Sequence, residues 1–178
     1  SANTPVPLDK IHIDLENFQN RRTPYSVNSV RGIMDAIIHD EFKKALMDDC
    51  KVWKDAKGDD YLLAGHSRRE AFHRLYKIYN NDVQSLSPEA QKELTKRCEA
   101  NKHDIHTLPF IVQMWCNKHD YYFDSLPSLY IQDMSFEDAK TVALMSNALA
   151  SAETDVERAD VYRQMRNSGK THQEIERF

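Results

Sequence analysis

A strand, a glycine and a helix that follow one another between residues 61 and 79 constrain the fold more than any other feature. Tyr61-Leu-Leu-Ala is typical of a short β-strand, which Gly65 ends. From about Ser67 to Tyr79, apolar residues recur at helical spacing and give one broad apolar face. A strand that passes through one glycine into a helix predicts a chain that packs helices against a sheet.

Strands and helices alternate through most of the chain and helices alone follow, which predicts an α+β or α/β body with a helical C-terminal part. Strands are expected at residues 6–13 with a turn inside, 50–54, 61–64 and 108–115. Helices are expected from Asn28 to about residue 47, from Ser67 to Tyr79, from Ser87-Pro88 within an insertion at 80–104, from Ser135 to Leu149, from Thr154 to about Asn167, and from Thr171 onward. Residues 14–27 and the segment around Pro127 are expected to be loops. The expected domains are a body at 1–133 and a helical C-terminal part at 134–178.

The overall charge limits how the chain meets nucleic acid. A formal net charge of −4 is unlike that of a domain that grips DNA over its whole surface, so a DNA contact would need a local basic patch. The three cysteines form no Cys-x-x-Cys pair, which favours reduced thiols in a cytoplasmic protein. No apolar run approaches the roughly 18 residues of a membrane span, so no membrane partner is expected.

The start of the helix after Gly65 carries two arginines, Arg68 and Arg69. The first N–H groups of a helix lack partners inside it, and the helix dipole favours negative charge there. A glycine allows close approach of the backbone, and an arginine can donate to two phosphate oxygens. The turn is therefore a candidate phosphate site. The alternative is a solvated helix start whose arginines form salt bridges with Glu70 or Asp59.

Residues 65–71, Gly-His-Ser-Arg-Arg-Glu-Ala, resemble the G-x-x-R-x-x-A signature of the ParB/sulfiredoxin superfamily. ParB proteins typically carry Gly-Glu-Arg-Arg there, and several relatives from phages and mobile elements carry Gly-His-x-Arg. Three more segments follow in the family's order. Residues 6–11 resemble its opening strand, 20–22 its Asn-Pro-Arg element, and 145–159 its Glu-Asn-x-x-Arg segment with the next helix. The resemblance spans residues 6–178 and implies a ParB-like N-terminal domain of a plasmid, phage or conjugative element. It also implies an α+β fold, in which a small mixed sheet with helices is followed by a helical C-terminal part that enters a helix-turn-helix.

The resemblance implies a pocket for a nucleoside triphosphate, such as CTP, with Mg²⁺. The implied nucleotide-binding residues are Gly65, His66, Ser67, Arg68, Arg69, Arg21, Arg22 and Asn147. Asn147 would contact the nucleotide or Mg²⁺, whereas Ser146 stands where the family has glutamate, and Ala150 or Ser151 where it has arginine. Nucleotide binding would serve DNA binding or partition by rearranging the C-terminal helices.

Enzymatic alternatives follow from the same resemblance. Sulfiredoxins carry a catalytic cysteine in this turn; no cysteine lies within ten residues of it here, so a reductase is not expected. Free-serine kinases of the superfamily take a general base from the first loop, where Asp14 and Glu16 stand, and His66 is a further catalytic candidate. A nuclease would need clustered carboxylates for metal, for which Asp59-Asp60 or the Asp14 and Glu16 pair are candidates. A catalytically silent adaptor for DNA or protein remains a third class.

Residues 161–178 resemble the entry to the helix-turn-helix region of ParB-like proteins. The chain stops before a recognition helix, so we expect a fragment of a longer protein. The expected partners are DNA, through segments beyond Phe178, and a second copy of the chain in a homodimer. The alternative is an ordinary C-terminal amphipathic helix.

Two further patterns in the sequence could serve a chemical function, one as a zinc site and one as an aromatic surface for bases. The spacings His103-x-x-His106 and Cys116-x-x-His119 could ligate zinc, but the strand expected between the pairs does not ensure that they converge. The aromatic residues at 121–123 and Tyr130 could stack on bases, although packing of a loop onto the core is the favoured interpretation.

Overall fold

A computed structural model describes residues 3–19, 25–39 and 50–151 of the chain. The expected helices at 154–167 and from 171 onward, and with them the helix-turn-helix prediction, lie outside the described residues. Among the helices of the described ranges, none has the length and apolar character needed to cross a membrane.

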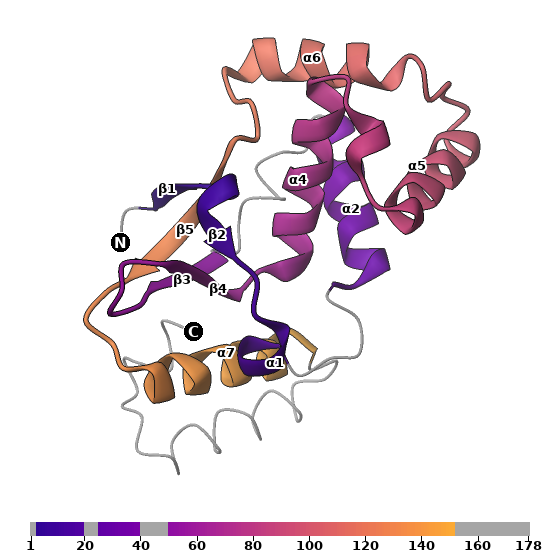
Figure 1. Cartoon of the computed structure of the whole chain (residues 1–178). Coiled ribbons are helices and arrows are strands. Elements are labelled where there is room, and N and C mark those ends of the chain that lie inside the picture. The colour runs from indigo at the N-terminus through magenta and orange to yellow at the C-terminus, as the bar shows by residue number, and fades with distance from the viewer. Residues whose placement is uncertain (1–2, 20–24, 40–49, 152–178) are drawn as a thin grey trace. The chain divides into compact units, whose positions relative to one another are not determined.

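The described residues form an α+β fold with five strands and six α-helices (Figure 1). The strands are β1 (Thr4–Pro7), β2 (Ile11–His12), β3 (Cys50–Lys54), β4 (Asp60–Ala64) and β5 (Ser125–Ile131). The helices are α1 (Leu15–Phe18), α2 (Val27–Ile38), α4 (His66–Tyr79), α5 (Pro88–Ala100), α6 (Leu108–His119) and α7 (Phe136–Ser151). The mixed sheet has the order β1-β5-β3-β4-β2, in which β2 pairs parallel with β4 and the pairs β1–β5 and β3–β4 are antiparallel. The predicted fold class is thus confirmed as α+β with a mixed sheet.

The hairpin of β3 and β4 is formed as predicted. Trp53 pairs with Tyr61 across the ladder. In the turn, one carboxylate oxygen of Asp55 accepts from the backbone N–H groups of Lys57 at 3.0 Å and Asp59 at 2.8 Å. Gly58 has φ of 88°, a left-handed conformation that glycine adopts without a steric cost.

The helix that begins at Ser87-Pro88 is confirmed, and so is the helix after Ser135. The Ser87 hydroxyl accepts from Ala90 N–H at 3.2 Å, and Pro88 occupies the first turn of α5, where its missing N–H costs nothing. The Ser135 hydroxyl accepts from Asp138 N–H at 3.2 Å at the start of α7. Local capping signals were sufficient in both cases.

Two segments of the body have the opposite structure from the one predicted. Residues 108–115, expected as a strand, belong to helix α6, whose buried residues Leu108, Val112, Trp115 and Cys116 follow helical spacing. The β-branched residues at 111–112 favour a strand locally. Burial of one helical face stabilises the helix more than this local preference stabilises a strand. The segment around Pro127, expected as a loop, is strand β5, in which Pro127 lies opposite Pro5 of β1.

Two boundaries also differ from the prediction. Helix α2 is capped by Ser26 and not by Asn28, because the Ser26 hydroxyl accepts from Ser29 N–H at 3.3 Å. Within the expected loop at 14–27, Asp14 caps the short helix α1, since its carboxylate accepts from Asn17 N–H at 3.1 Å.

The chain divides into two compact units, which we describe separately. Of the described residues, unit 1 comprises 3–10, 25–39, 50 and 65–129, and unit 2 comprises 11–19, 51–64 and 130–151. In unit 1, α2 and α4 lie side by side, and α6 contacts both (Figure 1). In unit 2, α7 packs on β4 and on α1 through a core of Phe18, Trp53, Leu63, Ala139, Val142 and Ala143.

The aromatic residues after α6 are packed within unit 1, which agrees with the favoured interpretation. Phe123 is fully buried and contacts Phe72 edge-on at 5.2 Å between ring centroids. Trp115 stacks on Phe123 at 5.2 Å, and Tyr122 meets Tyr79 at 5.5 Å. In unit 2, the Tyr130 hydroxyl donates to the Asp60 carboxylate, and its pKa is raised to about 12 by desolvation and by that carboxylate.

Candidate anion-binding site

The α4 helix begins at Gly65 in a conformation that requires glycine. Gly65 is the N-cap residue, with φ of 96° and ψ of 30°, in the left-handed region. A Cβ built on Gly65 would lie 2.4 Å from Sγ of the buried Cys50. The fold therefore requires glycine at position 65 whether or not a ligand binds at this turn.

The first turn of α4 has no side-chain cap in the part of the chain that the structure describes. Gly65 has no side chain to accept from the first N–H groups, and the first helical hydrogen bond runs from Arg69 N–H to Gly65 O at 2.9 Å. The first N–H groups of a helix have no acceptor inside the helix, and the positive end of the helix dipole lies at the same end. The turn thus keeps the backbone chemistry that binds anions.

A second helix begins beside this one. The Ser67 hydroxyl accepts from Ser26 N–H at 3.1 Å, and Ser26 is the N-cap of α2. Neither α2 nor α4 has an acidic residue in its first turn. Two positive helix ends therefore meet within unit 1 without the carboxylates that usually compensate them. Sequence reasoning missed this pairing because it started α2 at Asn28.

The Arg68 side chain is buried at this start, and only 9% of the residue is exposed. Its Nε is covered from solvent and has no hydrogen-bond acceptor among the described residues, and no described carboxylate forms a salt bridge with it. A buried cation without an acceptor is costly, because neither water nor protein replaces its lost hydration. A bound anion would supply the missing partner.

The neighbouring Arg69 is only partly compensated. One terminal nitrogen lies 3.6 Å from the Glu70 carboxylate, whereas its Nε has no acceptor in the described ranges. Burial lowers the pKa of Arg69, and the Glu70 charge acts against that effect. The salt bridge predicted as the alternative to an anion therefore exists for Arg69 with Glu70, but it is long.

The Glu70 carboxylate is also shared with a third arginine. Arg74 is 2% exposed and donates to Glu70 at 3.1 Å and to the Tyr25 hydroxyl at 2.7 Å, and it pairs with Glu93 of α5 at 2.7 Å. These carboxylates raise the pKa of Arg74 above its ordinary value, although burial opposes them. Arg74 is thus satisfied within the protein, which distinguishes it from Arg68.

Two histidines, His66 and His73, lie in the first two turns of α4. Desolvation lowers the pKa of His73, and the positive charge of Arg69 is the next largest cause. His66, the first residue of the helix, is only 6% exposed. Burial and the nearby Arg69 charge therefore disfavour the protonated form of His73, whereas His66 is shielded from solvent.

The other predicted site residues lie elsewhere or outside the described residues. Asn147 belongs to α7 in unit 2, where its amide nitrogen donates to Phe18 O at 3.0 Å. Arg21 and Arg22 lie outside the described residues. Whether Asn147 and these arginines join the α4 turn in one pocket stays a prediction.

The candidate catalytic carboxylates have ordinary structural surroundings. Both oxygens of Asp14 accept from Asn17, one from its backbone and one from its side chain. Glu16 is exposed on α1. In the described part of the chain, no group of three or more histidine, cysteine or acidic side chains lies close enough to hold a metal ion, and this includes the His103, His106, Cys116 and His119 set.

One buried residue of unit 2 had no signal in the sequence. Lys51 of β3 is 4% exposed, and its ammonium donates to the Ser146 hydroxyl at 3.0 Å. In a strand whose side chains alternate between a buried and an exposed face, Lys51 would lie on the exposed face. Four consecutive residues of β3 are buried instead. The Ser146 hydroxyl of α7 thus accepts from a buried lysine.

Comparisons with models of protein families, with curated proteins and with solved structures found no match to this chain.

Proposed function

We propose that the chain is a nucleotide-binding domain that holds the phosphates of a nucleoside triphosphate at the start of α4. The observation that carries this proposal is Arg68, a buried arginine in the first turn of a helix whose Nε has no described acceptor. The uncapped α4 turn supplies backbone N–H groups, and the adjacent start of α2 adds a helix-dipole end of the same sign. A polyanion would give Arg68 an acceptor and would interact favourably with both helix ends.

The class of nucleotide and the biological role rest on the resemblance to ParB-like domains. CTP is the first candidate, and the role is DNA binding or partition on a plasmid, phage or conjugative element. Guanidinium and backbone N–H groups match the phosphates directly. Mg²⁺ would enter mainly through phosphate oxygens, since it keeps most of its waters and needs few protein ligands. Such an ion would neutralise part of the triphosphate charge.

Calorimetric titration with CTP and MgCl₂ tests the proposal. Arg68→Met removes the charge and retains the apolar stem of the side chain. A lost charge-assisted hydrogen bond is worth about 1.5–3 kcal/mol, so the dissociation constant should rise roughly 10- to 100-fold. Lys96→Met removes one exposed charge from α5 of the same unit and is the matched control.

The comparison of ligands separates phosphate binding from recognition of the base. Cytidine should bind far more weakly than CTP, and inorganic triphosphate should compete with CTP. Equal affinity of the wild type and Arg68→Met would refute the assignment of the site. Equal affinity for all four nucleoside triphosphates would retain the phosphate site and reject CTP as the particular ligand.

A further inference from the structure

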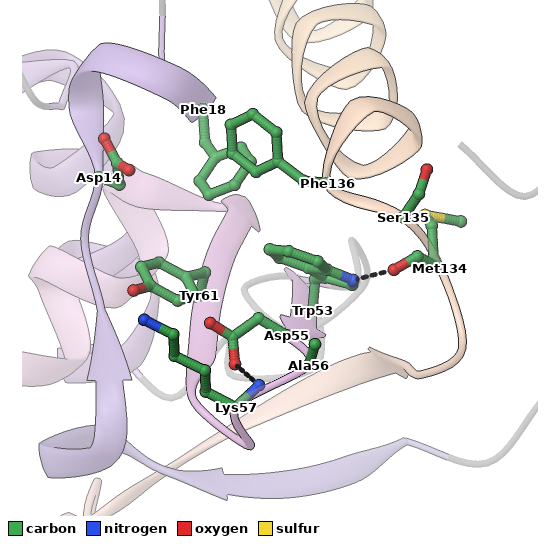
Figure 2. A pocket seen from close by; sticks show the side chains of 10 residues that line it. All are labelled: Asp14, Phe18, Trp53, Asp55, Ala56, Lys57, Tyr61, Met134, Ser135 and Phe136. Carbon is green, nitrogen blue, oxygen red and sulfur yellow. Dashed lines mark hydrogen bonds between the residues drawn. The ribbon is translucent and has the colours of Figure 1, made fainter.

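Unit 2 contains a pocket of about 340 Å³ between α1, the β3–β4 turn and the start of α7 (Figure 2). It is separate from the α4 turn, because every residue that lines it belongs to unit 2. Its volume lies in the lower range of small-molecule sites. The lining residues are Asp14, Phe18, Trp53, Asp55, Ala56, Lys57, Tyr61, Met134, Ser135 and Phe136.

The walls of this pocket are aromatic rings inclined to one another, from 39° between Trp53 and Tyr61 to 70° between Phe18 and Trp53. Phe18 meets Trp53 at 70° and Tyr61 at 61°, with 5.9 Å between centroids in both pairs. Phe136 meets Phe18 at 60° and Trp53 at 53°. A flat base is held best between two parallel rings, whereas rings at these angles surround a rounded group. Figure 2 shows these four rings around the same space.

The indole of Trp53 is fixed before any ligand arrives. Its Nε1 donates to Met134 O at 2.9 Å, and the residue is 5% exposed. Phe136, in contrast, is 40% exposed on the first turn of α7. The pocket thus combines a held indole with an accessible phenyl ring at its edge. Such a preformed wall keeps the entropic cost of binding low.

Two carboxylates, those of Asp14 and Asp55, line the pocket. Asp14 accepts from Asn17, and Asp55 accepts from backbone N–H groups of its own turn. Because these donors are neutral, they do not cancel the negative charge of either carboxylate. Desolvation raises the pKa of Tyr61, and the carboxylates of Asp55, Asp59 and Asp14 raise it further. Lys57 is the one cation among the ten lining residues, and it is exposed. The charge balance therefore favours a cationic ligand.

We propose that this pocket binds an alkylated ammonium group, carried by a choline-like small molecule or by a methylated lysine side chain of a protein partner. Aromatic faces attract a cation through the charge distribution of the ring, and Trp and Tyr do so best. An ammonium that carries methyl groups sheds water easily and offers apolar surface to the accessible ring of Phe136. The carboxylates of Asp14 and Asp55 add electrostatic attraction for the cation. This inference is independent of the nucleotide proposal.

The charge itself is tested with choline and its neutral isostere 3,3-dimethylbutan-1-ol, titrated into the full chain and followed by tryptophan fluorescence. Cation–π attraction of about 1–2 kcal/mol predicts that choline binds roughly 5- to 30-fold tighter than the alcohol. Asp55→Asn keeps an acceptor for the turn and should weaken choline binding severalfold. Lys57→Met removes the opposing cation and should strengthen it.

Phe136→Ala tests the aromatic wall, and Phe110→Ala is its control because Phe110 is a 65% exposed phenylalanine on α6 of unit 1. The first variant should weaken choline binding and the second should not. Equal binding of choline and the neutral alcohol would overturn the proposal. Binding of cytidine that choline does not displace would also overturn it, and would assign the pocket to a base.

A peptide that contains trimethyllysine distinguishes the two sources of the ligand. Binding of the peptide about tenfold or more tighter than choline supports a protein partner, and a choline affinity at or above that of the peptide supports a small molecule. Both results agree with the ammonium site. The unmethylated peptide should bind more weakly than the trimethylated one, and equal binding of the two would contradict the proposal.

Discussion

Arg68→Met should leave the ligand-free protein as stable as the wild type or make it more stable, which is the reverse of the usual effect of a core substitution. Arg68 is 9% exposed, and its Nε has no acceptor among the described residues, so the folded state bears an uncompensated desolvation cost. Methionine has a similar length and fills the space of the stem. Replacement of poorly compensated buried charges by apolar residues stabilises proteins by about 1–4 kcal/mol, and we expect the lower end.

Thermal unfolding with and without triphosphate measures both parts of this prediction. A gain of about 1 kcal/mol corresponds to roughly 2–4 °C in Tm for a chain of this size. A ligand at about 100 times its Kd adds about 2.7 kcal/mol to the stability of the wild type, or roughly 5–10 °C. The variant should lose most of that ligand-induced increase. The pattern is therefore a higher Tm without ligand and a smaller increase with it.

The opposite pattern would refute the reasoning. If ligand-free Arg68→Met unfolds several degrees below the wild type, Arg68 has a partner within the protein, and its burial no longer indicates an anion. Lys96→Met, which removes an exposed charge, should change the Tm little in either condition.

Four more predictions follow from the described contacts. Arg74→Met should destabilise the protein by about 3 kcal/mol in a urea titration, the lower end for a broken buried ion pair, because Glu93 keeps contact with solvent; an effect below about 1 kcal/mol would contradict the network. Gly65→Ala should cost about 1–3 kcal/mol, since φ is 96° and the new Cβ meets Cys50, and removal of the Cys50 side chain should restore only part of the loss. The pKa of Tyr130, raised to about 12, favours the neutral phenol in the folded state. The contribution of Tyr130 to stability is therefore complete below about pH 10 and is lost as the pH rises through 12. In a tyrosine absorbance titration, Tyr130→Phe should remove a component that titrates near pH 12, and an unchanged titration would refute this. Burial raises the pKa of Cys116 to about 11, so iodoacetamide at neutral pH should label it only when the protein unfolds, as peptide mapping would detect.

Local signals in the sequence were enough to predict the strand, glycine and helix around Gly65 and the capped helices after Ser87 and Ser135. They failed where burial decided the structure. Residues 108–115 have β-branched side chains, but a helical face of four buried residues places them in α6. Pro127 suggested a loop, although Leu126 and Ser128 on either side of it are fully buried in β5.

Of the candidate anion-binding site, only the first turn of α4 could be predicted from the sequence. The sequence indicates a glycine followed by arginines, but the hydrogen bond between Ser26 and Ser67 joins segments 41 residues apart. The exposure of an arginine also depends on tertiary packing, so the contrast between Arg68 and the satisfied Arg74 could not be predicted. The aromatic pocket was missed for the same reason, since its walls come from three distant segments and α1 was expected to be a loop.

The central claim is that an anion binds at the start of α4, and it is tested most directly by amide chemical shifts during titration with inorganic triphosphate. The proposal predicts saturable shifts that are largest for the N–H groups of residues 66–68, in the first turn of α4, and that are abolished by Arg68→Met. Shifts that stay small at these residues, or that are centred on another surface and persist in the variant, would contradict it.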